Sequence, residues 1–398
     1  MKFFNHDGSC CSYTDLIQRL NNINSSSNIV LFNEPLKFFT QLLFNICNNI
    51  DSILFDNDMS ESEKEFYEKD LILYDNLYSN KINDINDLLN LIYNSKSRIC
   101  IFTSGTTGKP KKVNHSVSKF VEMSRVDDKY KNDIWSFLYN PTHMAGIQVF
   151  FQALLNQNFI IFLFKSTRKQ FINSCNKYSV TSISATPTFF RLLAPFDFKL
   201  KSIKKCTLGG EKSDLNLNNN LKNIFPCTKL YNIYASTEAG TVFISTKGNL
   251  FKVMNSTIDK VKFIDNEIFL HKTLMYENYK EEWFPTGDIV EFTNESKTEF
   301  RFLSRNSDTV NIGGNRINLL EIESEIYKIK GVENVLVYTL ENSVIGKVLV
   351  SKIVTSIKYS KKEFKLQLKE KLQSYKVPAI IKFVNEIEVT RTGKIKRN

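Results

Sequence analysis

The feature that most constrains this chain is a loop rich in hydroxyl groups, glycine and lysine at residues 101–113, with the sequence IFTSGTTGKPKKV. It follows a short apolar run, residues 99–102, which is typical of a buried strand. Gly105 and Gly108 let backbone N–H groups approach an anion closely, and the surrounding hydroxyl and ammonium groups add donors. The sequence therefore predicts a phosphate-binding loop whose contacts are Thr103, Ser104, Gly105, Thr106, Thr107, Gly108 and Lys109.

The spacing of this loop differs from that of the Walker phosphate loop, which has the pattern G-x-x-x-x-G-K-[ST]. Here two residues separate Gly105 from Gly108, and Pro110 follows Lys109. Because proline interrupts helices, we expect no long helix to continue from the loop, so a mobile hairpin would hold the anion. On composition alone, a solvated surface loop is the alternative interpretation.

The composition indicates an ordinary globular protein. A chain of 398 residues with 42% hydrophobic side chains can bury at least one large core, in about two or three structural units. The formal charge of +11 is compatible with nucleic acid or an anionic membrane as a partner. However, the lysines are spread along the chain and no nucleic-acid-binding motif is present, so we expect no nucleic-acid partner.

The cysteines and the N-terminus bear on the cellular compartment. The seven cysteines are scattered and lack C-x-x-C spacing, which argues against a disulfide framework and a zinc site. The N-terminal MKFFNHDGSC becomes polar too early for a signal peptide, and no apolar run reaches the length of a membrane span. We therefore expect a cytoplasmic protein without a membrane span.

Strand and helix patterns alternate along the chain and predict an α/β fold. Residues 29–32 and 52–55 are typical of strands, and an amphipathic helix with Leu36, Phe39, Leu43 and Ile46 on one face lies between them. The charged segment 60–70 is expected to be a solvated helix face or loop. From residue 317 onward, helical and strand patterns again alternate, which predicts a small α+β unit.

Three predicted strands after the loop end in small and polar residues. The first precedes Pro187, the second ends at Gly209, Gly210 and Glu211, and the third at residues 234–240. Ligands of open α/β sheets bind beyond the carboxyl ends of strands, so these ends predict one nucleotide pocket, although each alone is compatible with a simple turn. His143 precedes an apolar helical run; it is either a core or capping histidine or a residue that faces the ligand.

The segment TSGTTGKPK resembles the signature of the adenylate-forming superfamily, which includes acyl-CoA ligases, peptide-synthetase adenylation domains and firefly luciferase. Further segments resemble that family's motifs in the same order. They are the adenine loop at Gly209, Gly210 and Glu211, the Y-G-x-T-E motif at Tyr234–Glu238, the ribose-binding Asp288 and Arg305, the pantetheine-facing Gly313 and Gly314, and the terminal Lys394. Three positions depart from the family pattern, namely Ala235, Ser307 and Asn311.

This resemblance implies a two-domain architecture. A large domain of β-sheets layered with helices, residues 1–304, would bind the nucleotide and the acyl substrate. A small mobile α+β domain, residues 305–398, would rotate about Ser307 as a hinge and carry the catalytic Lys394. The protein is expected to be a monomer or a homodimer.

The resemblance also implies a ligase that joins an acid to a thiol in two steps. A carboxylate attacks ATP to give an acyl-adenylate, and the thiol of coenzyme A or of a phosphopantetheine arm on an acyl carrier protein then displaces AMP. Lys394, Thr237, Glu238 and His143 would be catalytic, and Glu238 would bind Mg²⁺. No carboxylate lies near residues 143–144 to pair an α-ammonium group, which favours a fatty, aryl or other acid without one.

Two other functions remain open from the sequence. Ala235, Ser307 and Asn311 are compatible with a nucleotide-binding protein that has lost ligase activity. The basic charge leaves a nucleic-acid-binding module as a third, less favoured interpretation, which predicts binding that weakens steeply with salt.

Overall fold

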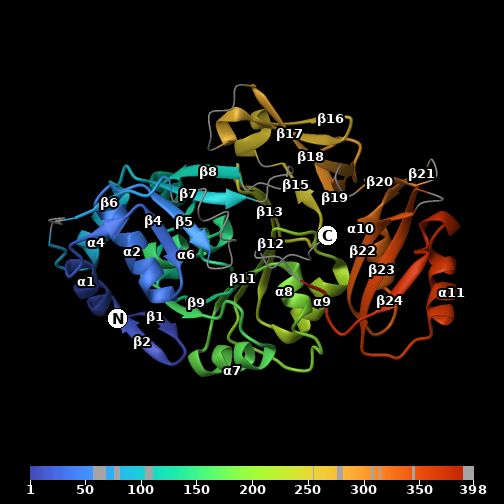
Figure 1. The fold of residues 1–398 in the computed structure, drawn as a ribbon, viewed down its shortest axis with the longest axis horizontal. Coiled ribbons are helices and arrows are strands. Elements are labelled where there is room, and N and C mark those ends of the chain that lie inside the picture. Colours follow the sequence, from blue (N-terminus) through green and yellow to red (C-terminus); the bar gives the residue numbers. More distant parts are fainter. Residues whose placement is uncertain are drawn as a thin grey trace.

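The computed structural model describes residues 1–56, 69–75, 81–103, 111–253, 255–275, 281–305, 309–312, 315–342 and 346–388. Figure 1 shows a large sheet-rich part and, beside it, a smaller group formed by the C-terminal strands and helices. This arrangement confirms the predicted α/β class, with a large N-terminal domain and a small C-terminal one.

The largest sheet within the described residues has eight strands in the order β14-β13-β12-β11-β9-β10-β1-β2. Its central strands run parallel, whereas the edge strands β14 and β2 are antiparallel to their neighbours. The carboxyl ends of the central strands therefore meet at one edge. The strands are β1 (Lys2–His6), β2 (Ser9–Ser12), β9 (Ile134–Phe137), β10 (Phe159–Phe162), β11 (Ser182–Ala185), β12 (Lys205–Gly209), β13 (Lys229–Ser236) and β14 (Gly240–Ser245).

Helices cover both faces of this sheet. Because side chains alternate along a strand, Ile160 and Phe162 belong to one hydrophobic core and Ile161 to another. The first core includes α1 (Tyr13–Asn21), α2 (Pro35–Cys47), α4 (Ile85–Tyr93), α5 (Val117–Met123) and α6 (Met144–Leu155). The second includes α7 (Arg168–Tyr178), α8 (Pro187–Arg191) and α9 (Leu215–Ile224).

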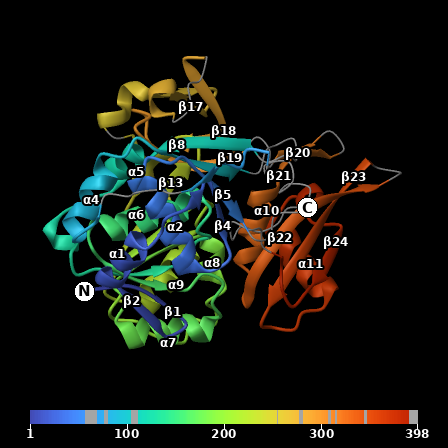
Figure 2. The same cartoon turned by 60° about the vertical axis from the view of Figure 1, so that its left-hand side comes forward.

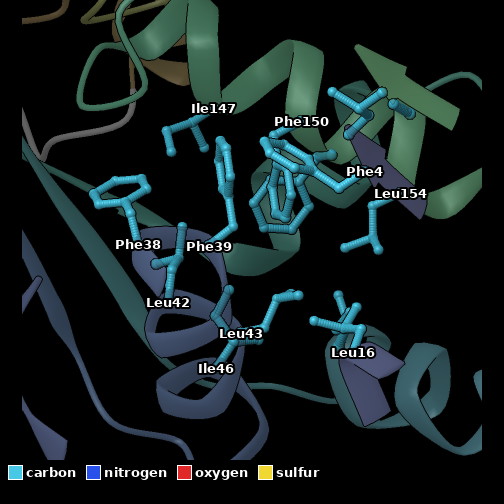
Figure 3. Packing of buried hydrophobic residues seen from close by; sticks show 14 of the residues in the cluster. Phe4, Leu16, Phe38, Phe39, Leu42, Leu43, Ile46, Ile147, Phe150 and Leu154 are labelled. Carbon is cyan, nitrogen blue, oxygen red and sulfur yellow. The ribbon is translucent and has the colours of Figure 1, made fainter. Parts of the chain in front are cut away.

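Aromatic rings dominate the core under α2 and α6. The rings of Phe39 and Phe150 lie against each other (Figure 3), with centroids 4.0 Å apart and planes 10° apart. Phe4, Phe39, Leu43 and Ile46 are all essentially inaccessible to solvent. The predicted helix with Phe39, Leu43 and Ile46 on its apolar face is confirmed as α2.

A four-stranded sheet carries the predicted phosphate-binding loop. It consists of β4 (Ile29–Phe32), β5 (Ser52–Asp56), β7 (Arg98–Thr103) and β8 (Lys111–Ser116), in that order. Strands β7 and β8 are antiparallel, with Thr103 opposite Lys111. A strand, not a helix, therefore follows the loop, as the position of Pro110 predicts. Residues 104–110 themselves lie outside the described ranges.

An antiparallel five-stranded sheet follows in the order β15-β19-β18-β17-β16. Its strands are β15 (Phe251–Lys252), β16 (Val261–Ile264), β17 (Glu267–His271), β18 (Trp283–Phe292) and β19 (Glu299–Arg305). The T-G-D segment, Thr286–Asp288, lies inside β18. Gly287 has φ +72°, and the register of β18 shifts against both neighbouring strands, β17 and β19, so the strand is irregular at this segment.

The C-terminal elements have a hydrophobic core of their own. They are β20 (Thr309–Ile312), β21 (Asn315–Asn318), α10 (Leu319–Tyr327), β22 (Val332–Asn342), β23 (Gly346–Thr355), α11 (Lys361–Lys371) and β24 (Ile380–Phe383). Short elements complete the described chain: β3 (Ser26–Ser27), β6 (Leu73–Tyr74) and the 3₁₀ turns Asp128–Tyr130, Asn255–Lys260, Lys272–Leu274 and Ser374–Lys376.

Polar contacts join the two parts of the molecule. The guanidinium carbon of Arg191, in α8, lies 4.7 Å from the centroid of the Tyr327 ring, in α10. The Leu303 carbonyl accepts hydrogen bonds from Lys212 Nζ and Asn318 Nδ2, each at 3.3 Å. Figures 1 and 2 both show α10 and β22 beside α8. No helix in the described ranges is long and apolar enough to cross a membrane.

Candidate active site

A cavity of about 480 Å³ lies between helix α6 and strands β9, β11, β12, β13 and β14. Five residues that sequence reasoning singled out line it together. They are His143, Gly209, Gly210, Ala235 and Thr237. Residues from three separate strand ends thus meet at one pocket, as the parallel arrangement of β11, β12 and β13 predicts.

Alternate residues of strand β12 and every fourth residue of helix α6 form two walls of the cavity. On β12, Lys205, Thr207 and Gly209 line it, whereas Cys206 and Leu208 point into the core on the other side of the sheet. On α6, Met144, Gln148 and Gln152 line the opposite wall at four-residue intervals, which puts them on one helix face.

The segment that leads into α6 is held rigidly. Asn140 Nδ2 donates a hydrogen bond to Asp56 Oδ2 at the end of β5, and Thr142 Oγ1 donates to the same oxygen at 3.3 Å. A Cβ atom on Gly146 would lie 2.3 Å from the Asn140 carbonyl oxygen, so only glycine permits this approach of helix and loop. Asp56, Asn140 and Gly146 therefore position His143. The only signal for Asp56 in the sequence is an acidic residue that ends an apolar strand.

His143 satisfies part of each interpretation that the sequence left open. It occupies the N-cap position of α6, but its side chain makes no capping hydrogen bond to the helix. Instead the half-buried side chain lines the cavity. The imidazole therefore contributes to the cavity wall and does not cap the helix.

The predicted adenine loop follows β12. Gly210 has φ +82°, a conformation that favours glycine, whereas a Cβ atom on Gly209 would meet only ordinary contacts at 3.7 Å and beyond. Glu211 Oε2 accepts hydrogen bonds from Thr188 N at 2.9 Å and from Thr188 Oγ1 at 2.7 Å. The Glu211 carboxylate therefore fixes the loop to the beginning of α8.

The three residues predicted to hold the nucleoside are close together. The Tyr234 hydroxyl donates a 2.5 Å hydrogen bond to Asp288 Oδ2, and Asp288 is buried. In the backbone pairing of β18 with β19, Asp288 lies opposite Arg305. The Tyr234 ring stacks on Phe302, with centroids 4.5 Å apart and planes 20° apart, so one of its two faces is already covered. Stacking of Tyr234 on adenine stays a prediction and would use the other face.

A register shift between Tyr234 and Ala235 lies next to the turn that follows β13. In this turn Thr237 lines the cavity and Glu238 is half-buried beside it. No group of three or more His, Cys, Asp or Glu side chains suited to a metal converges among the described residues. Mg²⁺ commonly binds through one or two carboxylates together with substrate phosphates, and the single carboxylate of Glu238 fits that mode.

Several predicted site residues fall outside the described ranges. They are Ser104, Gly105, Thr106, Thr107, Gly108, Lys109, Ser307, Gly313, Gly314 and Lys394. Thr103 and Arg305 are placed as the last residues of β7 and β19.

Comparison with known sequences identifies the family. The sequence model of the AMP-binding enzyme family matches residues 48–268, which is more than half of the chain, and that of the AMP-binding enzyme C-terminal domain matches residues 321–394. The chain belongs to the AMP-binding enzyme family. The predicted resemblance to the adenylate-forming superfamily is thereby confirmed.

Curated relatives of this AMP-binding enzyme include acyl-coenzyme A synthetase ACSM5, mitochondrial, from Homo sapiens. It is 25% identical over 350 residues, covering 75% of this chain and 59% of the relative. The 2-succinylbenzoate–CoA ligase of Staphylococcus epidermidis is 23% identical over 349 residues, covering 79% of this chain and 72% of the relative. The chain thus spans about three fifths of the length of the human relative.

Solved structures share the fold. The O-succinylbenzoate coenzyme A synthetase of Bacillus subtilis, in complex with ATP and magnesium ion, superposes with a TM-score of 0.68 at 17% identity, covering 99% of this chain and 95% of that one. The anthranilate CoA ligase AuaEII, in complex with anthranoyl-AMP, gives a TM-score of 0.75 at 14% identity, covering 99% and 92%.

Proposed function

We propose that this AMP-binding enzyme activates a carboxylic acid with ATP and transfers the acyl group to coenzyme A. In the first step a carboxylate oxygen attacks the α-phosphorus of ATP, giving an acyl-adenylate and pyrophosphate. In the second a thiol attacks the acyl carbon and AMP leaves. This proposal rests mainly on the observation that His143, the end of β12 and the turn at Thr237 line one cavity.

The cavity suits an acid without an α-amino group. Among the described residues that line it there is no Asp or Glu, so nothing there would pair an α-ammonium group. Its volume of about 480 Å³ is within the usual range for small-molecule sites. Ala235 is part of the wall, so its methyl group occupies space that a glycine would leave open.

The nucleotide would lie beyond the carboxyl ends of β12 and β13. Asp288 and Arg305 would hold the ribose, Gly209–Glu211 and Tyr234 the adenine, and Thr103–Lys109 the β- and γ-phosphates. Glu238 would hold Mg²⁺, which neutralises charge on the phosphate oxygens when bound. No general base is required because the attacking carboxylate is already ionised at neutral pH.

Lys394 would supply the positive charge where the substrate carboxylate meets the α-phosphate. Rotation of the small domain about Ser307 would then remove Lys394 and bring Gly313 and Gly314 to the thiol. The names of the relatives favour coenzyme A as that thiol. The alternative acceptor thiol is that of a phosphopantetheine arm on an acyl carrier protein.

Acid-dependent exchange of pyrophosphate into ATP tests the first step directly. Across a panel of carboxylic acids, we expect exchange with at least one acid, and thioester formation when coenzyme A is added. Lys394→Ala should lower exchange by about 100-fold or more, whereas Lys396→Ala, two residues away, is the matched control. ATP binding without exchange by any acid would instead support a nucleotide-binding protein without ligase activity.

A further inference from the structure

The end of the cavity away from Gly209 carries positive charge that the proposed chemistry does not use. Lys205 begins β12 and lines the cavity on the same face as Thr207 and Gly209. Four residues of strand at roughly 3.3 Å each put the backbone of Lys205 about 13 Å from that of Gly209. Arg125 lines the cavity as well.

Lys205 lies in an aromatic and partly buried environment. Its Nζ atom is 5.1 Å from the centroid of the Trp135 ring and 5.6 Å from that of the Tyr130 ring. Burial lowers the pKa of Lys205; Asp133 opposes this effect and Arg125 adds to it. In the described part of the chain no carboxylate lies within 4 Å of Lys205 Nζ. A half-buried ammonium group without a hydrogen-bonded counter-ion is poorly solvated and gains from an anionic ligand.

Helix α6 and the residue that follows it hold the backbone of Arg125, whose side chain is exposed. Gln152 Oε1 accepts a hydrogen bond from Arg125 N, and Gln152 Nε2 donates one to Arg125 O, both at 2.9 Å. Asn156 Nδ2 donates a third, also at 2.9 Å, to the same carbonyl oxygen. Because Gln148 and Gln152 share the face of α6 that lines the cavity, this end of the pocket is polar.

We propose that Lys205 and Arg125 bind a second carboxylate, at the end of the substrate opposite the reacting carboxyl group. The preferred substrates are then dicarboxylic acids long enough to reach from the Gly209 end of β12 to its Lys205 end. This inference rests on the proposed function, which places the reacting carboxyl near His143 and Thr237. A substrate with one carboxyl group would leave Lys205 without a carboxylate in direct contact, with only the more distant charge of Asp133 nearby.

Matched pairs of acids test this inference. Each pair is a straight-chain dicarboxylic acid and the monocarboxylic acid with the same number of carbon atoms, assayed for pyrophosphate exchange over a range of chain lengths. Wild-type kcat/KM should favour the dicarboxylic acid by about 10- to 100-fold at the optimal length, as expected for a charged hydrogen bond. Lys205→Met should remove this preference by raising KM for the dicarboxylic acid while leaving KM for ATP unchanged.

Lys229→Met is the matched control. Lys229 pairs with Lys205 in the neighbouring strand β13, but it is exposed and is not part of the cavity wall. It should keep the wild-type preference. Equal kcat/KM for both members of every pair, or a preference that survives in Lys205→Met, would overturn the inference even if the enzyme activates acids.

Ligand-induced thermal stabilisation separates this inference from the proposed function. Binding of an acid to the folded protein raises its melting temperature whether or not chemistry follows. Stabilisation by a dicarboxylic acid that is reduced in Lys205→Met and Arg125→Gln, without any pyrophosphate exchange, would support the anion site and refute the ligase. Exchange with monocarboxylic acids, and no stabilisation by dicarboxylic acids, would do the reverse.

Discussion

Gly146→Ala is the substitution whose consequence the structure defines most sharply. The new Cβ atom would lie 2.3 Å from the Asn140 carbonyl oxygen, 3.1 Å from the carbonyl carbon and 3.2 Å from Pro141 Cα. All three contacts are backbone atoms, so no side chain can rotate away to relieve them. Either α6 or the loop at 140–142 has to move by about 1 Å, which is the kind of shift that overpacking forces on a core.

Two opposing effects determine the stability of this variant. Alanine is favoured over glycine in a helix by up to about 1 kcal/mol, and less in a first turn. Overpacking costs about 1–3 kcal/mol, and rigid backbone neighbours place this case toward the upper end. We therefore expect Gly146→Ala to lower the free energy of unfolding by about 2 kcal/mol. Asn140 and His143 line the cavity and would move with the displaced loop. Acid activation should therefore fall as well.

Gly209→Ala is the matched control, since it adds the same methyl group at a position without a clash. Its nearest neighbours would be Ile233 O at 3.7 Å and Tyr139 Oη at 3.8 Å, which are ordinary contacts. Urea unfolding should give a stability equal to wild type or higher by up to about 1 kcal/mol. KM for the acid should nevertheless rise, because Gly209 lines the cavity.

The two variants should thus separate stability from binding. Gly146→Ala with wild-type stability would show that the helix and loop relax without cost, and the reasoning from backbone contacts would be wrong. An equal loss of stability in Gly209→Ala would show that the added methyl group itself, and not its neighbours, causes the effect.

Two further predictions concern buried polar groups. Burial lowers the pKa of His115 from 6.5 to about 4. As the pH falls, the unfolded chain therefore binds a proton at this histidine before the folded protein does. About 3 kcal/mol of the free energy of unfolding is lost as the pH falls from 6.5 to about 4. His115→Phe should reduce this slope in urea titrations at several pH values, and an unchanged slope would contradict it. Tyr234→Phe removes the hydroxyl that donates to buried Asp288, so urea unfolding should show a loss of about 1–2 kcal/mol and KM for ATP should rise; unchanged values of both would contradict the assigned contact.

Local chemistry explains which parts of the fold could be predicted. The period of 3.6 that defines α2 and the apolar runs that define β4 and β5 are properties of neighbouring residues, and they appear as expected. Pro110 likewise excludes a helix after the phosphate loop, and β8 follows. The conformation of the T-G-D segment could not be assigned from its sequence, because glycine and aspartate are common in turns as well as in irregular strands.

Contacts between distant residues could not be predicted in the same way. Asp56 and Asn140 are 84 positions apart. Asp56 ends β5, whereas Asn140 lies in the loop after β9, a strand of a different sheet. The residues around either one give no indication of the other. The same holds for Arg191 and Tyr327, which join the two parts of the molecule. Each pair depends on how sheets and helices pack, which a motif at one site does not encode.

One end of the cavity could be predicted from local sequence motifs, whereas the other end could not. The end at which we propose that the carboxyl group reacts consists of residues that follow strands, where glycine and hydroxyl groups recur in recognisable motifs such as Gly209–Glu211. The far end consists of Lys205, at the start of a strand, and Arg125, in a connection, and neither belongs to any motif. The sequence does not predict which face of the sheet a lysine at the start of a strand will be on. Only the observed register places Lys205 on the cavity side. Substrate choice can therefore vary without any change in the motifs for the chemistry, so substitutions at Lys205 should alter KM for the acid and leave KM for ATP unchanged.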